Sequence, residues 1–197
     1  MTPGMTRVSL TSMGLLRVFV LSVMALASGW AGVAVPPAPG QTRGEARAIE
    51  DAWLHLDAPD RAVRAAARLA IEAQPFDSWK GRALGETRTW AALEALLALV
   101  RSCPRAQADE LRPHVCEGIT TLHLEEMRAE QRLAAVRLTR LVFARLGGPA
   151  ADERRQMLDL WSRFLPAKSG SGADERQFDK SLRALLKFLA LPDAPPK

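Results

Sequence analysis

The chain has 197 residues, of which 48% are hydrophobic, enough apolar material for one domain of ordinary size. Ala, Leu and Arg dominate and Tyr is absent, a composition that favours helices over strands. The formal net charge is +5, and it falls to about +3 without Arg7 and Arg17. This balance argues against nucleic-acid binding, which depends on concentrated basic surface.

Residues 1–34 have the features of a secretory signal peptide. Arg7 and Arg17 precede an uncharged run from Val18 to Val35, which passes into small residues. We expect cleavage after one of three of them, Gly29, Ala31 or Ala34, and export to the periplasm or the medium. The alternative is an uncleaved membrane anchor, because the run nearly reaches the ~20 residues that a spanning helix needs.

Helices separated by short breakers are expected from residue 44 to residue 192. Residues 35–43 before them read as a Pro-rich linker, and residues 193–197 as a disordered tail. Apolar periodicity and breakers predict eight helices over about 44–56, 59–73, 77–84, 89–103, 109–122, 125–146, 151–164 and 174–191. No stretch predicts a strand.

Several helix ends carry recognisable signals. Asp57 is a good cap and Pro59 suits a first helical position, before a stripe of Val63, Ala66, Ala67 and Ala70. Thr87 or Thr89 is expected to cap the fourth helix. Pro113 predicts either a kink or a regular helix that starts near Arg112. Glu125 and Glu126 are expected to open the sixth helix, where negative charge suits the helix dipole.

The predicted fold is all-α, a short α-solenoid of about four antiparallel helix pairs of the HEAT or armadillo kind. The second helices of the pairs begin near residues 59, 89, 127 and 174, an irregular repeat whose range overlaps that of such proteins. An isolated pair cannot bury its own apolar face, so stacking stabilises each pair. A compact helical bundle is the alternative.

Three stretches resemble HEAT-like repeats of large secreted proteins of planctomycete-type bacteria. They are Trp53-Leu-His-Leu-Asp-Ala-Pro-Asp-Arg-Ala-Val-Arg-Ala-Ala-Ala-Arg-Leu-Ala-Ile-Glu72 with Trp79-Lys-Gly-Arg-Ala-Leu84, Glu130-Gln-Arg-Leu-Ala134 leading to Phe143-Ala-Arg-Leu-Gly147, and Leu182-Arg-Ala-Leu-Leu-Lys-Phe-Leu-Ala-Leu-Pro192. In that family the segment often lies beside a sugar-dehydrogenase-like propeller and a c-type cytochrome domain. Neither neighbour occurs in this chain, and no Cys-x-x-Cys-His motif is present to attach haem.

Cys103 and Cys116 are the only cysteines, and two interpretations remain open for them. In an oxidising compartment such a pair is often a disulfide across a turn. If the fifth helix starts near Asp109, Cys116 lies ~10 Å along its axis and bridging becomes doubtful, leaving two free thiols. Metal binding and thiol catalysis are not expected.

Arg61, Arg64 and Arg68 form a basic row on the second helix. They provide either a ridge for an acidic partner or, as we favour, pairs with acidic residues of the adjacent repeat. The acids within reach are Asp57, Asp60, Glu72 and Glu94. The three histidines, at positions 55, 114 and 123, read as ordinary surface or turn residues.

No catalytic, cofactor-binding or metal-binding motif is found in the sequence. We therefore expect an extracytoplasmic scaffold or protein-binding module without catalysis or cofactor, with an unidentified protein as its partner. The alternative, which comes only from the resemblance, is an accessory subunit of a periplasmic dehydrogenase and cytochrome c system.

Overall fold

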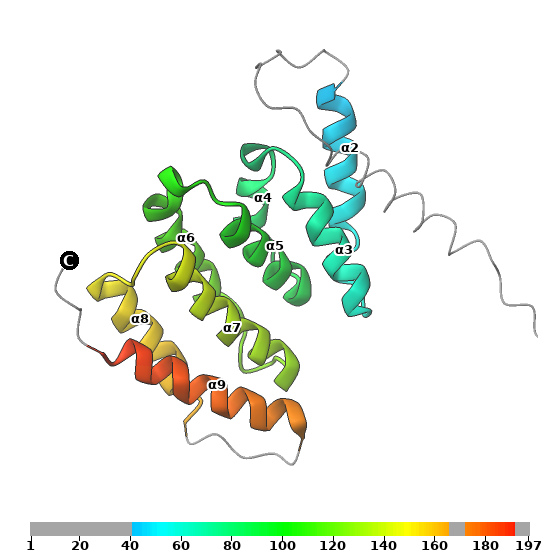
Figure 1. Cartoon of the computed structure of the whole chain (residues 1–197). Coiled ribbons are helices and arrows are strands. Elements are labelled where there is room, and N and C mark those ends of the chain that lie inside the picture. Colours follow the sequence, from blue (N-terminus) through cyan, green and yellow to red (C-terminus); the bar gives the residue numbers. More distant parts are fainter. Residues whose placement is uncertain (1–40, 166–171, 192–197) are drawn as a thin grey trace, which may run out of the picture. The chain divides into compact units, whose positions relative to one another are not determined.

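The computed structural model describes residues 41–165 and 172–191, and these residues form helices without any strand. The all-α class is confirmed. The elements are α2 (Gln41–Trp53), α3 (Arg61–Glu72), η1 (Phe76–Ser78), α4 (Lys80–Leu84), α5 (Thr89–Ser102), η2 (Arg105–Gln107), α6 (Ala108–Thr120), α7 (Ala129–Arg145), α8 (Ala151–Ser162) and α9 (Ala173–Leu189) (Figure 1). None of these helices is long and apolar enough to cross a membrane. The predicted signal peptide and tail lie outside the described residues.

The helices contact one another in two sets. In the first set, which we call the odd helices, α3 contacts α5, α5 contacts α7 and α7 contacts α9 (Figure 1). In the second set, the even helices, α4 contacts α6 and α6 contacts α8. Each even helix also contacts the odd helix that follows it, beginning with α2 and α3. The buried side of each helix from α3 onward therefore faces at least two neighbouring helices.

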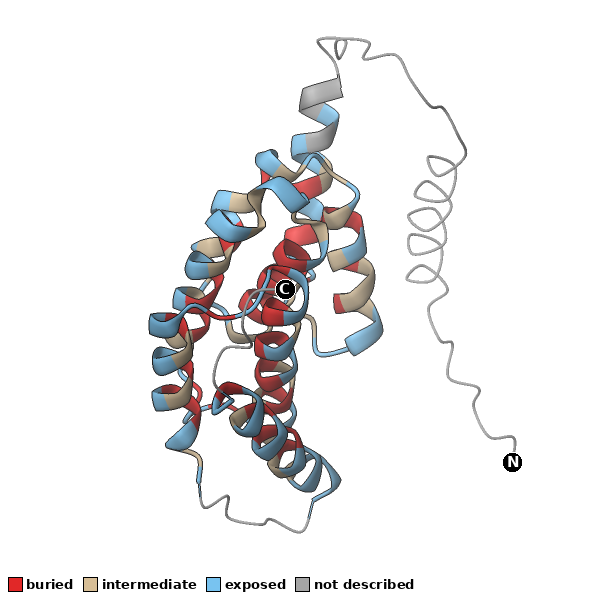
Figure 2. Ribbon diagram, turned by 60° about the vertical axis from the view of Figure 1, so that its left-hand side comes forward, coloured by how far each residue is buried: buried red, intermediate tan, exposed pale blue. Residues whose placement is uncertain are grey.

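The core runs along the contact between the two sets, where the buried residues of Figure 2 gather. Helix α5 contacts α3, α4, α6 and α7, and eight of its 14 residues are buried. The predicted stripe on α5 is buried at Leu93, Leu96 and Val100 but only partly at Leu97. Small residues such as Ala95 and Ala98 are fully buried beside it, which lets neighbouring helices approach closely.

Three tryptophans anchor the core at separate points along the chain. Trp53, Trp79 and Trp161 are each exposed by 1% or less, and each contributes a large apolar ring. Trp53 ends α2, Trp79 precedes α4 and Trp161 lies near the end of α8. Burial of such a side chain stabilises the fold by about 2–3 kcal/mol.

Several predicted helix ends are wrong. Asp60, and not Asp57, caps α3: its carboxylate accepts the N–H of Ala62 at 2.7 Å, so the helix begins after Pro59. Helix α7 begins at Ala129, because the side chain of Gln131 accepts the Arg128 N–H at 2.9 Å and closes the first turn there. Glu125 and Glu126 lie exposed in the preceding turn and do not open the helix.

Further corrections concern the starts of α5 and α2. Neither Thr87 nor Thr89 caps α5; Arg88 occupies the N-cap position, and its side chain makes no capping hydrogen bond. Helix α2 begins at Gln41, within the predicted linker.

Pro113 lies inside α6, which begins at Ala108 and not near Arg112. The N–H that Pro113 lacks would bond four residues back, at the exposed Asp109, where water can satisfy the free carbonyl.

Candidate functional site

The predicted arginine row on α3 is divided by the fold into one buried, one half-buried and one exposed side chain. The Arg64 side chain is 5% exposed, and its Nη1 donates to the carbonyl oxygens of Ala58 at 2.7 Å and Pro59 at 3.0 Å. Its guanidinium also lies 3.8 Å from the ring centroid of Trp90, a stacking contact that favours arginine over lysine. Arg64 therefore fastens the loop before α3 to the first turn of α5. The predicted apolar stripe is rotated accordingly, since Val63 and Ala66 are only half-buried.

Two carboxylates connect these arginines to α5. Glu94 of α5 lies 3.1 Å from Arg68 Nε and 3.8 Å from Arg64 Nε. Glu72, at the end of α3, lies 3.7 Å from Arg68 and accepts a hydrogen bond from Arg101 of α5 at 2.9 Å. Burial raises the pKa of Glu94, and the positive charges of Arg68 and Arg64 oppose that rise.

Arg61 is left outside this cluster. Its side chain is exposed and makes no hydrogen bond or ion pair with any residue that the structure describes. Of the candidate acids, Glu72 and Glu94 pair with the row, whereas Asp57 and Asp60 bond backbone N–H groups instead.

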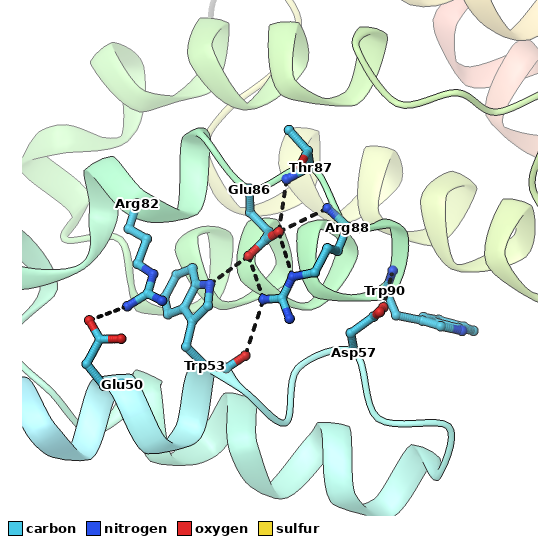
Figure 3. A network of polar contacts seen from close by, with 8 residues as sticks. All are labelled: Glu50, Trp53, Asp57, Arg82, Glu86, Thr87, Arg88 and Trp90. Atoms are coloured by element: carbon cyan, nitrogen blue, oxygen red, sulfur yellow. Dashed lines mark hydrogen bonds and ion pairs between the residues drawn. The ribbon is translucent and has the colours of Figure 1, made fainter.

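A second polar cluster surrounds Glu86, in the loop between α4 and α5 (Figure 3). The Glu86 carboxylate accepts the indole N–H of Trp53 at 2.7 Å, the backbone N–H groups of Thr87 and Arg88 at 3.0 and 2.9 Å, and two bonds from the Arg88 guanidinium. Burial raises the pKa of Glu86, but these donors together outweigh it and lower the pKa to about 2. Glu86 thus joins the end of α2 to the start of α5.

The same tryptophan is covered on its ring. Arg82 of α4 lies 4.4 Å from the Trp53 ring centroid and pairs with Glu50 of α2 at 2.7 Å (Figure 3). Sequence reasoning did not find the Glu86 cluster. The one local signal was an acidic residue shortly before a helix start, which commonly satisfies free N–H groups.

A third cluster lies at the opposite ends of the helices, around Arg112 of α6. Arg112 Nε donates to Glu153 of α8 at 2.9 Å, and its Nη1 donates to the carbonyl oxygen of Leu146, just after α7, at 2.9 Å. Glu153 in turn accepts the backbone N–H of Ala150 at 2.8 Å at the start of α8. Three successive helices therefore meet at one guanidinium.

A groove of about 490 Å³ is present among the described residues. It lies where α5 and α7 begin, beside the loop before α3. Its lining includes the half-buried Trp90 and the exposed Pro59, with the charged residues Asp57, Arg88, Arg128 and Glu130. Trp90 extends away from the Glu86 cluster in Figure 3. An amphipathic ring flanked by charges of both signs suits a polypeptide segment more than a small charged metabolite.

The two cysteines are free thiols. Cys103 is half-buried, and its Sγ lies 3.3 Å from the carbonyl oxygen of Pro104. Cys116 is buried among apolar residues of α6, and burial raises its pKa to about 12. Because α6 begins at Ala108, Cys116 lies roughly 12 Å along its axis, and the structure shows free thiols in place of the alternative disulfide.

The histidines stay apart from one another. His55, His114 and His123 are all exposed and belong to different parts of the fold. Within residues 41–165 and 172–191 no group of three or more His, Cys, Asp or Glu side chains is arranged to hold a metal ion.

Comparison with known proteins does not extend this description. No family model, curated protein or solved structure matches the chain. What the groove can bind is therefore inferred from its own residues.

Proposed function

We propose that the chain is an extracytoplasmic protein-binding scaffold, built as a short HEAT-like α-solenoid and without catalysis. The observation that carries this proposal is the pattern of which helices contact one another. Each odd helix contacts the next odd helix, each even helix after α2 contacts the next even helix, and each even helix contacts the odd helix after it. Four stacked pairs, α2/α3, α4/α5, α6/α7 and α8/α9, account for this order.

Polar contacts between neighbouring pairs support stacking over a bundle around one centre. Arg68 and Glu94 join the first pair to the second at 3.1 Å. Arg145 of α7 donates to the carbonyl oxygen of Arg101, in α5, at 3.1 Å and joins the second pair to the third. Arg112 and Glu153 join the third pair to the fourth at 2.9 Å. Each link lies between adjacent pairs, as nearest-neighbour stabilisation in a repeat array requires.

The groove at the starts of α5 and α7 is the proposed recognition site. It is contributed by three successive pairs, so its shape depends on the stacking. Trp90 can serve as the apolar anchor of an interface, and Arg88 and Arg128 as its polar rim. The proposed extracytoplasmic location depends on the signal-like sequence of residues 1–34.

Site-specific photocrosslinking in the native host tests this function. A photoreactive amino acid is placed at Thr89 or Glu130, which line the groove, and at Glu110, an exposed control position on α6. We expect one shared crosslinked product from both groove positions and none from Glu110. Absence of that product, or equal products from all three positions, contradicts the proposal.

The same experiment distinguishes a general scaffold from the alternative function, an accessory subunit of a periplasmic dehydrogenase and cytochrome c system. If the crosslinked partner carries covalently bound haem, detected by in-gel haem staining, the chain is an accessory subunit of a cytochrome system. A partner without haem favours the scaffold.

A further inference from the structure

We propose that the outward side of α7 and α9 is a second binding surface, separate from the groove, and that it binds an acidic segment of another protein. This inference rests on the proposed scaffold function and specifies the chemistry of a partner. We call this surface the α7/α9 face. It is formed by Arg137, Arg140 and Ala144 of α7 and by Lys180, Ala184 and Lys187 of α9, all of them exposed.

Charge is divided unequally between the two sets of helices. The odd helices contain twelve Lys and Arg against six Asp and Glu, whereas the even helices contain seven against nine. The excess of positive charge thus lies on one side of the stack, although the chain as a whole carries only +5. A one-sided field of this kind steers association with a partner of opposite charge.

Except for Arg61, the positive charges of α3 and α5 are paired with carboxylates, but those of the α7/α9 face are not. Arg64, Arg68 and Arg101 pair with Glu72 or Glu94. By contrast, four cations of the α7/α9 face have no ion pair or hydrogen bond with any described residue: Arg137, Arg140, Lys180 and Lys187. The arginine row of α3, which the sequence suggested as a possible binding ridge, therefore has a mostly structural role. The basic surface that is available to a partner is the α7/α9 face.

Acidic residues on α7 and α9 lie at the helix starts or already have a cation. Glu130, in the first turn of α7, lies 3.0 Å from Arg128. Asp179 pairs with Arg183 at 3.0 Å. Asp174 and Glu175 lie in the first turn of α9. The middle and end of both helices therefore present cations without a neighbouring free carboxylate.

The four cations share one side of the molecule. Lys180 and Lys187 are seven residues apart, as are Arg137 and Ala144, and seven residues are two helical turns. These exposed positions lie apart from the buried residues through which α7 and α9 pack, such as Val142 of α7 and Leu185 of α9. The rings of Phe143 and Phe188, whose centroids are 6.2 Å apart, hold the two helices beside each other (Figure 1).

The surroundings of the cations favour a protein over a membrane or a nucleic acid. Ala144 and Ala184 lie among them and allow a partner backbone to approach the helices. Phe188, 40% exposed, is the one large aromatic side chain at the edge of the face. Interfacial membrane helices insert several large apolar residues, and single strands stack on several aromatic rings. Residues 1–44 of this chain contain no Asp or Glu, so they do not supply the acidic segment.

Fluorescence anisotropy with the purified full chain tests the inference. The probe is a fluorescein-labelled helical peptide of Glu and Ala, measured at low ionic strength. The test variant is Arg137→Glu, Lys180→Glu, Lys187→Glu. The matched control is Arg47→Glu, Arg105→Glu, Arg163→Glu, three exposed arginines outside α7 and α9 with the same change in net charge. We expect the test variant to bind about tenfold more weakly than wild type and the control to stay within about twofold.

Equal weakening by the two triple variants would overturn the inference, because net charge and not the α7/α9 face would then govern binding. Tighter binding to phosphatidylglycerol vesicles or to a single-stranded oligonucleotide, lost in the test variant, would also overturn it in favour of that class of partner. If the test variant melts at a lower temperature, the double variant Lys180→Glu, Lys187→Glu against Arg105→Glu, Arg163→Glu replaces it. Thr89 and Glu130, the positions of the groove crosslinking test, are not changed in these variants. A negative result here therefore does not affect that test, and the two proposals can fail independently.

Discussion

The carboxylate of Asp57 accepts the backbone N–H of Trp90 at 3.2 Å, across 33 residues of chain. Trp90 lies in the first turn of α5, where N–H groups have no partner within the helix. Asp57 therefore caps a helix to which it does not belong. The loop before α3 and the start of α5 are fixed to each other by this bond and by Arg64, which stacks on the same tryptophan.

Replacing Asp57 by Ala is expected to lower the free energy of unfolding by about 1 kcal/mol, as loss of a helix cap does. Asp57→Asn retains an acceptor oxygen and is expected to lose less. Urea unfolding followed by circular dichroism measures both. The control is Asp51→Ala, at an exposed position without a hydrogen bond or ion pair to any described residue. Equal losses for Asp57→Ala and Asp51→Ala would contradict the capping role.

Arg64 and Arg61 offer a second comparison on one helix. Arg64→Ala removes the donor to the carbonyl groups of Ala58 and Pro59 and the cation stacked on the Trp90 ring, while Glu94 keeps Arg68, and we expect a loss of about 3 kcal/mol. Arg61→Ala removes an exposed side chain and is expected to change stability by less than about 0.5 kcal/mol. Urea midpoints decide the question. Similar midpoints for the two variants would show that Arg64 contributes no more than a surface charge.

The all-helical class and most helix positions could be predicted from the sequence because apolar periodicity and breakers act locally. Gly147, with its φ of 101°, and Pro104 are such local signals, and both lie at ends that were placed correctly. Asp57 and Asp60 show where prediction from local sequence signals fails. Either residue can cap the next helix by its type, but Asp60 does so and Asp57 accepts the N–H of Trp90, 33 residues on, a contact that sequence spacing does not reveal.

The polar clusters could be predicted only in part, for the same reason. Pairing of the α3 arginines with acids was favoured from the sequence, but the burial of Arg64 among two carbonyl groups depends on the path of the loop before α3. Glu86 meets Trp53 only after the chain has passed through α3 and α4. Such contacts have no signature in sequence spacing, since they join helices that are far apart along the chain.

The low pKa of Glu86, about 2, makes stability depend on pH in a defined window. Since the folded-state pKa is below the ordinary value of 4.5, the stabilisation is complete above about pH 5 and is lost as pH falls toward 2. We expect Glu86→Gln to lose about 2 kcal/mol at pH 7 and little at pH 2. Urea midpoints at pH 7, 4 and 2.5 measure this, with the exposed Glu110→Gln as control. A constant difference between wild type and Glu86→Gln at all three pH values would contradict the assignment.

The thiols provide the last prediction. Burial raises the pKa of Cys116 to about 12, roughly a thousandfold reduction in thiolate relative to an ordinary thiol. Burial also raises the pKa of Cys103, whose side chain is half-buried. In the native protein without reductant, we expect two alkylatable thiols that react slowly at neutral pH, Cys116 more slowly than Cys103, and rapidly after unfolding. Time-resolved iodoacetamide labelling with mass spectrometry measures both rates, and Cys103→Ser isolates the slower one. A peptide containing Cys103 joined to Cys116 in a non-reducing digest would contradict the free-thiol structure, because α6 would then have to unwind from its start to bring Cys116 within bonding distance.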